Sequence, residues 1–238
     1  MSLSLDYYFK ELNAFAFGKA WFAGITSPAD ILVQAEKYLQ ETIVAKNVQE
    51  CHATFKGAPP HLEGNYYIGK GTVIAPDVVI CGPVYIGENV TIQSGALIRP
   101  GTILSDKTSV GHGSEVKASV LFSGAKVASL AFVGNSVLGK SARIGSGVIT
   151  ANRKFDQSDA GVTMNGQKEA LGTDFFGAII GDQTRLGANS VTQPGTHIGP
   201  NVWVFPLTCV RDFIGANQRV YAKQELVFVE NKSVKLKP

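Results

Sequence analysis

Aliphatic residues recur along this chain at an interval of six. From Ile68 to Phe122 the interval holds without a slip, and a small or β-branched residue follows nine of the ten leading positions four places later. The leading residues are Ile68, Ile74, Ile80, Ile86, Ile92, Ile98, Leu104, Val110, Val116 and Phe122. A period of six fits neither a helix of 3.6 residues per turn nor an open strand that alternates every two residues. The pattern therefore predicts a solenoid whose coils bury their inner faces by stacking on one another.

Each unit of six is expected to supply one short strand and one corner. The leading aliphatic side chain points inward, the small residue fits the corner, and Gly, Asp, Asn or Pro lies between them. This is the signature of an all-β solenoid of hexapeptide repeats. A sandwich whose strands happen to be evenly spaced is the alternative.

The repeat changes in two places. Just beyond Phe122, five-residue steps interrupt the sixes, and such slips often mark a backbone that is bent for a purpose. The repeat then stops at about 153–176 before it resumes. Asn165-Gly166 within this interruption predicts a hairpin that leaves the solenoid wall, and a loop of this length is more often functional or subunit-bridging than idle. We therefore expect a solenoid over 57–214 with an inserted loop.

The two ends of the chain do not follow the repeat. Residues 1–56 are expected to form a small helical N-terminal cap, in which Ser27 caps a helix and Pro28 suits its first turn. Aliphatic residues follow at helical spacing, and we expect them to dock on the first coil, which would otherwise expose a strand edge. Residues 215–238 are expected to form a final strand and a solvated tail.

Composition narrows the functional classes. With a formal net charge of +3 and no basic block, the chain is not expected to bind nucleic acid or a membrane surface. Its three cysteines match no metal-ligand spacing, and His52, His61 and His197 lack the spacing of a zinc site, so no metal is expected. Neither an export signal nor a membrane-spanning stretch is apparent, so we expect a cytoplasmic protein.

Two cations stand one predicted coil apart. Arg99 and Lys117 follow equivalent inward-facing positions and are 18 residues apart, which places them in adjacent rungs about 5 Å from each other. Like charges this close repel unless an anion lies between them, and arginine with lysine suits a phosphate. Glu115 is placed to neutralise them in part, so a solvated basic column with a salt bridge is the alternative.

Several segments resemble, in order and spacing, the acetyltransferase half of bifunctional N-acetylglucosamine-1-phosphate uridylyltransferases. They are residues 96–101, 111–117, 125–135, 144–152 and 177–182. The last of these segments, with 223–226, is similar also to the C-terminal domain of related sugar-1-phosphate nucleotidylyltransferases. The resemblance covers roughly 60–230, and residues 21–32 resemble the segment that ends the nucleotidylyltransferase domain. No glycine-rich nucleotide-binding start is found, so no nucleotidyl transfer is expected from this chain.

The resemblance implies a left-handed parallel β-helix and a homotrimer whose sites lie between neighbouring solenoids. It also implies acetyl transfer from acetyl-CoA to the amine of an amino-sugar 1-phosphate or a nucleotide sugar, with no metal required. Arg99 and Lys117 match the family's sugar-phosphate binders. Asn152 matches the asparagine near the acetyl group, although the tyrosine that follows it in the family is Arg153 here.

The catalytic motif of the family is altered in this chain. Ser129 stands in place of the histidine base, Phe132 in place of a substrate-binding tyrosine, and Asn135 in place of an aspartate. Attack of an amine on a thioester needs a group of near-neutral pKa to take the proton, which serine cannot do alone. His112 or Glu115 could substitute if the fold brings one of them to the site.

Two hypotheses of different classes remain open. In the first, the chain is an acetyl-CoA-dependent sugar-phosphate N-acetyltransferase with an altered base. In the second, it is a catalytically inactive trimeric scaffold that binds sugar phosphates or partners a separate nucleotidylyltransferase.

Overall fold

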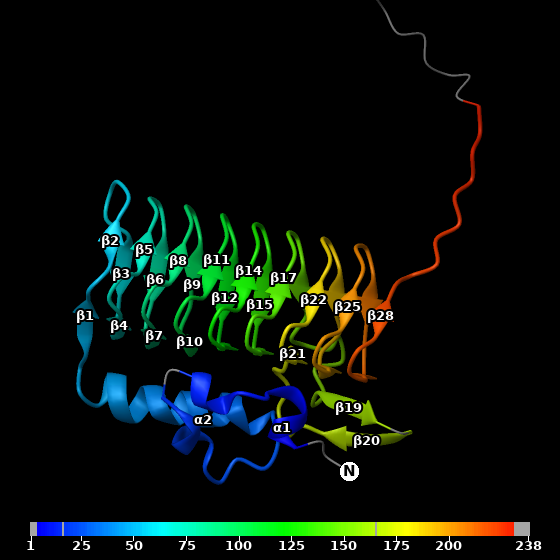
Figure 1. The fold of residues 1–238 in the computed structure, drawn as a ribbon, viewed down its shortest axis with the longest axis horizontal. Coiled ribbons are helices and arrows are strands. Elements are labelled where there is room, and N and C mark those ends of the chain that lie inside the picture. The colour runs from blue at the N-terminus through cyan, green and yellow to red at the C-terminus, as the bar shows by residue number, and fades with distance from the viewer. Residues whose placement is uncertain (1–3, 16, 165, 231–238) are drawn as a thin grey trace, which may run out of the picture.

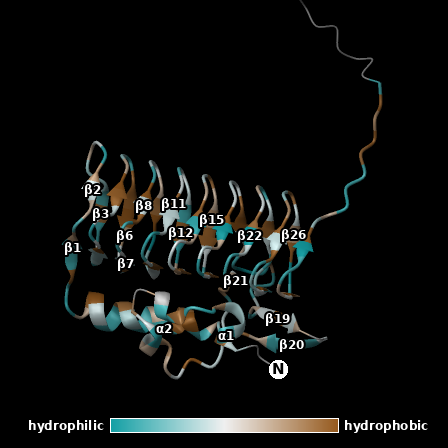
Figure 2. Cartoon of the chain, viewed as in Figure 1, coloured by the Kyte–Doolittle hydropathy of each residue, from teal (hydrophilic) through white to brown (hydrophobic). Residues whose placement is uncertain are grey.

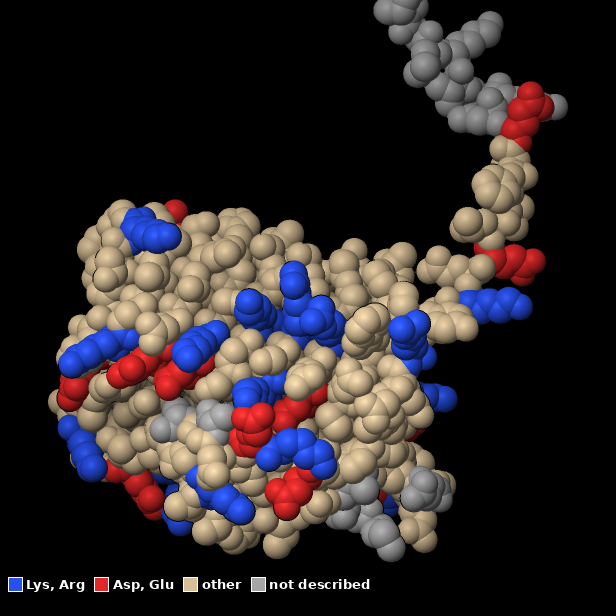
Figure 3. All heavy atoms as spheres, in the orientation of Figure 1, with Lys and Arg blue, Asp and Glu red and all other residues tan. Residues whose placement is uncertain are grey.

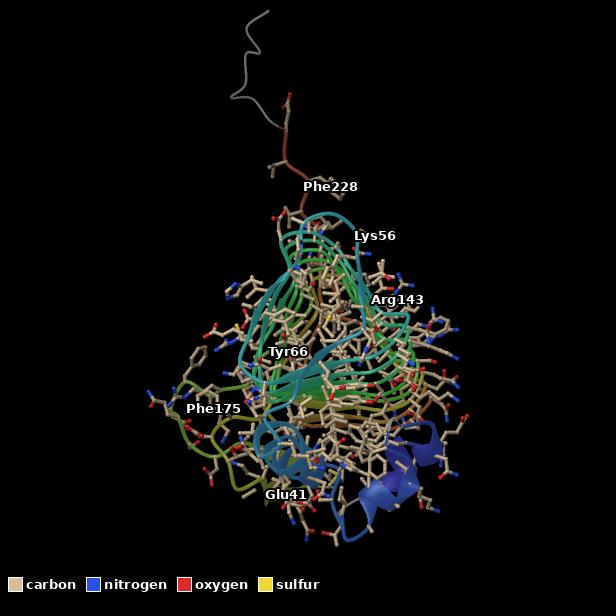
Figure 4. The ribbon with its side chains drawn as sticks, turned by 90° about the vertical axis from the view of Figure 1, so that its left-hand side faces the viewer. Glu41, Lys56, Tyr66, Arg143, Phe175 and Phe228 are labelled. Carbon is tan, nitrogen blue, oxygen red and sulfur yellow. The ribbon has the colours of Figure 1, made fainter. Side chains whose placement is uncertain are left out.

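The chain winds into a prism of triangular cross-section. The structure is a computed structural model that describes residues 4–15, 17–164 and 166–230. Figure 1 shows the prism from the side, and Figure 4 shows it along its axis. Three parallel sheets of nine, nine and eight strands form its walls. The predicted all-β solenoid, a left-handed parallel β-helix, is confirmed.

Each coil gives one strand to each wall, so neighbours in a sheet come from successive coils. Sheet A comprises β1 (Gln49–Cys51), β4 (Tyr66–Ile68), β7 (Val84–Ile86), β10 (Thr102–Leu104), β13 (Val120–Leu121), β16 (Val137–Leu138), β21 (Ala178–Ile180), β24 (Thr196–Ile198) and β27 (Phe213–Ile214). Sheet B comprises β2 (Thr54–Phe55), β5 (Val73–Ile74), β8 (Thr91–Ile92), β11 (Ser109–Val110), β14 (Lys126–Val127), β17 (Arg143–Ile144), β22 (Arg185–Leu186), β25 (Trp203–Val204) and β28 (Arg219–Val220). Sheet C comprises β3 (His61–Glu63), β6 (Val79–Cys81), β9 (Leu97–Ile98), β12 (Glu115–Lys117), β15 (Phe132–Gly134), β18 (Ile149–Thr150), β23 (Val191–Thr192) and β26 (Cys209–Val210).

The walls enclose an aliphatic core made from the leading positions of the repeat. Ile68, Ile86 and Leu104 pair in register down sheet A and are fully buried. Figure 2 shows the same apolar character on strand after strand of the prism. Like residues therefore stack on like in each column, and the free energy of this burial holds neighbouring coils together.

The N-terminal helices lie along the outer face of sheet A, and the predicted docking on the first coil is wrong (Figure 1). They are α1 (Leu5–Tyr8), η1 (Leu12–Ala14), η2 (Lys19–Phe22), α2 (Asp30–Tyr38) and η3 (Leu39–Val44). In sheet A the middle residue of each rung points outward, and it is apolar in most coils. These residues are Tyr67, Tyr85, Ile103, Val120, Val137, Ile179 and Phe213. This apolar stripe runs along most coils of sheet A and has to be covered, and the N-terminal helices cover it.

The inserted segment and the chain end leave the prism wall. β19 (Gly161–Met164) and β20 (Gln167–Ala170) form an antiparallel pair, as a hairpin around Asn165-Gly166 predicts, although Asn165 itself lies outside the described residues. After Val220, residues 221–230 extend away from the solenoid, and 231–238 of the predicted tail lie outside the described part (Figure 1). None of the helices among the described residues is long and apolar enough to span a bilayer.

Candidate functional site

Arg99 and Glu115 form an ion pair on the outer side of sheet C. β9 and β12 pair with Leu97 beside Glu115, and Arg99 Nη1 donates to Glu115 Oε1 at 2.7 Å. The two side chains are 43% and 31% exposed. Arg99 is therefore partly neutralised by its neighbour in the next rung.

Lys117 lies on the same strand as Glu115 but has a different partner. Its Nζ is 5.1 Å from the ring centroid of Phe175, a residue at the end of the inserted segment. No carboxylate in the described ranges forms a salt bridge with it. An aromatic ring attracts a cation without cancelling its net charge. Lys117 thus keeps the positive charge with which it would bind a phosphate.

The next rungs bring together three of the predicted site residues. Asn152 Nδ2 donates to Asn135 Oδ1 at 2.7 Å. Gly134 lies between Phe132 and Asn152, since a Cβ placed on it would stand 2.7 Å from the Phe132 ring and 2.9 Å from Asn152 Nδ2. Only glycine leaves room for both side chains at this position.

The two ends of the inserted segment pair with each other beside these residues. Arg153 and Phe175 form an antiparallel bridge, and the Phe176 N–H donates to the Asn152 carbonyl at 2.9 Å. The guanidinium carbon of Arg153 lies 4.7 Å from the centroid of the Phe175 ring. Sequence reasoning missed Phe175; the available signal was a pair of aromatic residues, Phe175 and Phe176, at the end of the interruption, where the chain rejoins the wall.

A cavity of about 400 Å³ adjoins this cluster. It lies between α2, the corner that joins sheets C and A, and the end of the inserted segment. Its lining includes Leu32, Pro100, Gly101, Ala118, Asn135 and Phe175. Its volume is in the range of small-molecule sites, and Asn135 and Phe175 connect it to the residues above.

Ser129 and His112 lie at a different corner, where sheet B turns into sheet C. The Leu130 N–H donates to the His112 carbonyl at 2.8 Å, and the Gly147 N–H donates to the Ser129 carbonyl at 3.1 Å. The two bonds are the same corner contact in successive coils, so His112 occupies, one coil earlier, the position that Ser129 holds.

The orientation of His112 is set by Ser94. Its Nδ1 lies 2.7 Å from the Ser94 carbonyl oxygen and 3.1 Å from Ser94 Oγ. A carbonyl oxygen can only accept, so we assign the proton to Nδ1, which leaves Nε2 with a free lone pair. Glu115, the other candidate base, is held by Arg99.

Within one chain the predicted site residues therefore form two groups. Arg99, Glu115 and Lys117 lie near Asn135 and Asn152 where the sheet C strands end and the chain turns toward sheet A, a place called the sheet C edge below. His112 and Ser129 lie at the opposite corner, where the chain enters sheet C. Four residues lie between His112 and Lys117, and the chain turns at 112–113 before β12, so the two are at most about 17 Å apart.

A column of cations runs down the outer face of sheet B beside the Ser129 corner. Lys126 pairs with Arg143, Arg143 with Arg185, and Arg185 with Trp203, on which the guanidinium of Arg219 stacks at 5.1 Å. Figure 3 shows Lys and Arg atoms gathered over β14, β17 and β22. In the described residues no carboxylate forms a salt bridge with Lys126, Arg143 or Arg185. Like charges stacked in neighbouring strands are destabilising, so this column favours a bound anion.

Two pockets flank Arg143 along this face. One, of about 270 Å³, includes Ser129, Lys126 and Arg143 in its lining. The other, of about 370 Å³, extends from Arg143 past Arg185 to Trp203. The cationic column thus continues from the Ser129 corner to an exposed indole ring.

Comparison with known proteins finds a matching family model and several relatives. Residues 80–176 match a family model described as the GMPPB C-terminal domain. The bifunctional protein GlmU of Methanococcus aeolicus is 33% identical over 186 residues, which are 78% of this chain and 45% of that protein. The chain spans about half the length of the GlmU relatives it matches.

A relative of similar length covers nearly all of the chain. The uncharacterized acetyltransferase YaiX of Escherichia coli strain 536 is 32% identical over 206 residues, which are 87% of this chain and 88% of that protein. Among solved structures, AntD, an N-acyltransferase from Bacillus cereus, aligns at 17% identity with a TM-score of 0.37 over 65% of this chain and 78% of that chain. No conclusion follows from a structural similarity this weak.

Proposed function

Since this chain belongs to the family of hexapeptide-repeat acetyltransferases, we propose that it transfers an acetyl group from acetyl-CoA to the amine of an amino-sugar phosphate or a nucleotide sugar. The observation that carries the proposal is the orientation of His112 beside the Ser129 position, with Nδ1 2.7 Å from the Ser94 carbonyl oxygen, so that Nε2 is the nitrogen left to take a proton. This arrangement supplies a base where the family's histidine is absent.

The proposed reaction forms a C–N and an S–H bond and breaks an N–H and a C–S bond. The neutral amine attacks the thioester carbonyl, the C–N bond forms, and His112 Nε2 takes the amine proton. The C–S bond then breaks and the proton passes to the departing coenzyme A thiolate. Ser129 lies next to this path as a hydroxyl that can donate or accept a hydrogen bond. A positioned base of this kind contributes roughly 10²- to 10⁴-fold in rate.

The cationic column on sheet B suits the phosphates of acetyl-CoA. Lys126, Arg143 and Arg185 carry charges that no carboxylate of the described residues offsets, and Trp203 provides a ring on which an adenine can stack. The column begins at the pocket that includes Ser129, which is where the thioester must lie. These contacts support acetyl-CoA as the donor.

The sheet C edge suits the acceptor. Lys117 supplies charge for its phosphate, with the Arg99–Glu115 pair beside it, and Asn135, Asn152 and Phe132 lie together in the next rungs. In one chain this edge and the His112 corner lie at opposite ends of β12, at most about 17 Å apart. We therefore propose that the complete site forms where the acceptor edge of one copy meets the His112 corner of a neighbour in a homotrimer.

The test is acetyl-CoA consumption with glucosamine 1-phosphate and galactosamine 1-phosphate. The parent protein is expected to turn over at least one of them, His112→Gln to lose at least about a hundredfold in kcat, and Ser129→His to retain or gain activity. Glucose 1-phosphate, which has no amine, is the blank. Turnover that survives His112→Gln unchanged would remove His112 from the mechanism.

Ser129 itself favours a second candidate function. A chain that binds sugar phosphates without transferring acetyl groups would act as a scaffold, or as the partner of a separate nucleotidylyltransferase. This function would be supported over acetyl transfer if neither the parent nor Ser129→His turned over these acceptors while sugar-phosphate binding remained measurable.

A further inference from the structure

We propose that the inserted segment completes the acceptor's phosphate site. In this inference, which rests on the proposed function, Arg153 is the second cation that binds the phosphate together with Lys117. Phe175 positions both cations, and the organic part of the acceptor enters the adjoining cavity of about 400 Å³. The ligand class is a sugar phosphate whose phosphate lies at the sheet C edge.

Arg99 is the weaker partner for Lys117, because its charge is already engaged. Its guanidinium donates to Glu115 at 2.7 Å, so an anion that binds Arg99 must compete with a carboxylate. Lys117 has no such competitor, and its Nζ lies over the Phe175 ring. The nearest carboxylate oxygen to Arg153, on Asp174, is 3.6 Å away, so Arg153 is held less closely than Arg99 and is the more available second cation.

Arg153, at the start of the inserted segment, can supply the second cation. It forms an antiparallel bridge with Phe175, and residues opposite each other in such a pair project to the same side. Its guanidinium carbon is 4.7 Å from the Phe175 centroid, and Lys117 Nζ is 5.1 Å from the same point. The two cationic groups are therefore no more than 9.8 Å apart, the sum of these distances. The proposal requires the two groups to lie closer together than this limit, on one side of the ring, because only then can one phosphate contact both at charge-assisted distances.

The wall of the prism leaves space for this arrangement. Lys117 pairs with Gly134 in the next rung, and Gly134 has no side chain to stand between Lys117 and the inserted segment. Phe175 projects from the corner of the prism, as Figure 4 shows along the axis. The lysine comes from the solenoid and the arginine from the insertion, so the ring is the contact that joins the two.

Phe175 assembles the cations without neutralising them. A carboxylate in its place would hold Lys117 and Arg153 but cancel the charge that the ligand requires, whereas the ring attracts each cation weakly. Arg153 has two further polar contacts, since Nη2 lies 3.6 Å from Asp174 Oδ2 and donates to Gln157 Oε1 at 3.0 Å. Asp174 therefore competes with the ligand for Arg153.

Isothermal titration with glucose 1-phosphate tests the inference apart from catalysis, because this probe has no amine to acetylate. Arg153→Gln is expected to weaken binding about tenfold, and Phe175→Leu about three- to tenfold, since charge-assisted contacts are among the strongest in such sites. Phe175→Tyr, which keeps the ring, should bind within about twofold of the parent. Asp174→Asn should bind more tightly. Arg211→Gln, which removes a remote arginine paired with Asp212, is the matched control and should not change the affinity.

Each negative result excludes a different claim. Parent-like binding by Arg153→Gln and Phe175→Leu would overturn the inference even if acetyl transfer were found. Tighter binding by Phe175→Leu would also overturn it, because the ring would then be occupying the site of the ligand. Absence of binding by the parent up to about 10 mM would do the same, since a two-cation phosphate site should be detectable at that concentration. The expected binding pattern without any acetyl transfer would reject only the proposed function.

Discussion

The imidazole of His197 packs edge-on against the ring of Tyr8, with centroids 5.9 Å apart. Through this contact α1 rests on the outer face of sheet A, and Phe176 lies on the imidazole at 6.0 Å. His197 is 3% exposed, and neither of its ring nitrogens nor the Tyr8 hydroxyl has a hydrogen-bond partner in the described residues. A buried imidazole without partners is stable only when it is neutral.

The free energy of unfolding is therefore expected to fall as the solution becomes acidic. Burial lowers the pKa of His197 from 6.5 to about 4. The unfolded chain binds a proton at this residue below pH 6.5, and the folded chain does so only near pH 4. The contribution of His197 is thus fully present above pH 6.5 and is lost between pH 6.5 and about 4, by about 3 kcal/mol in total. Urea unfolding at pH 7.5, 6, 5 and 4 measures it.

His197→Phe separates this contribution from other acid-sensitive groups. The variant keeps an aromatic ring under α1 and removes the titrating nitrogens, so its stability should depend less on pH across this window. Asp182 and Asp212, with Glu169 of the inserted hairpin, are carboxylates near these elements, and they remain in both proteins. An identical loss of stability in parent and variant would show that His197 is not the group responsible.

Asp182 is expected to hold the N-terminal helices to the solenoid. Its carboxylate accepts the backbone N–H of Lys10 at 2.8 Å and that of Lys140 at 2.7 Å, and it is 6% exposed. Asp182→Ala leaves two backbone donors without their acceptor and should lower the free energy of unfolding by about 2–4 kcal/mol. Asp182→Asn keeps one acceptor and should lose less. Hydrogen exchange at residues 5–15 should rise in Asp182→Ala, and protection equal to the parent would contradict the role.

The prism could be predicted from the sequence because its cause is local and periodic. Inward aliphatics at intervals of six, such as Ile80 and Ile98, fix both the strand and its register with the next coil. The docking of the helices was not predicted, although the signal was present. Tyr67 and Tyr85 stand 18 residues apart just before the inward position of sheet A, and an apolar residue there has to be covered.

The site was predictable in part for the same reason. The separation of 18 residues that places Arg99 near Lys117 also aligns Glu115 with Leu97, so the ion pair followed from the register. The contact of Arg153 with the Phe175 ring depends on how the 21 residues between them fold back, which no repeat encodes. Which partner Lys117 takes was therefore beyond sequence reasoning.

Gly134→Ala is expected to damage the acceptor side of the site more than the fold. The added methyl would stand 2.7 Å from the Phe132 ring and 2.9 Å from Asn152 Nδ2, so one of these side chains must move. We expect the affinity for glucose 1-phosphate to fall at least about fivefold, with about 1–3 kcal/mol lost in stability. Gly215→Ala is the matched control, because its added methyl would come no closer than 3.4 Å to the Gln218 side chain and 4.0 Å to the Tyr7 hydroxyl. Equal effects of the two substitutions would mean that the close approach at Gly134 has no bearing on the ligand.

Oligomers that contain two different inactive variants should recover activity that neither variant shows alone. If each site takes His112 from one copy and Lys117 from a neighbour, then His112→Gln and Lys117→Ala remove different halves of every site. After equimolar unfolding and refolding together, about a quarter of the sites should combine an intact His112 with an intact Lys117. Acetyl transfer should therefore rise from near zero to about a quarter of the parent rate, whereas the two variants mixed without refolding should stay inactive. Recovery would require that the site be shared between copies. If the refolded mixture stays inactive while refolded parent protein regains its rate, both halves must act within one chain, and the strand that separates them would have to be bridged by the ligand alone.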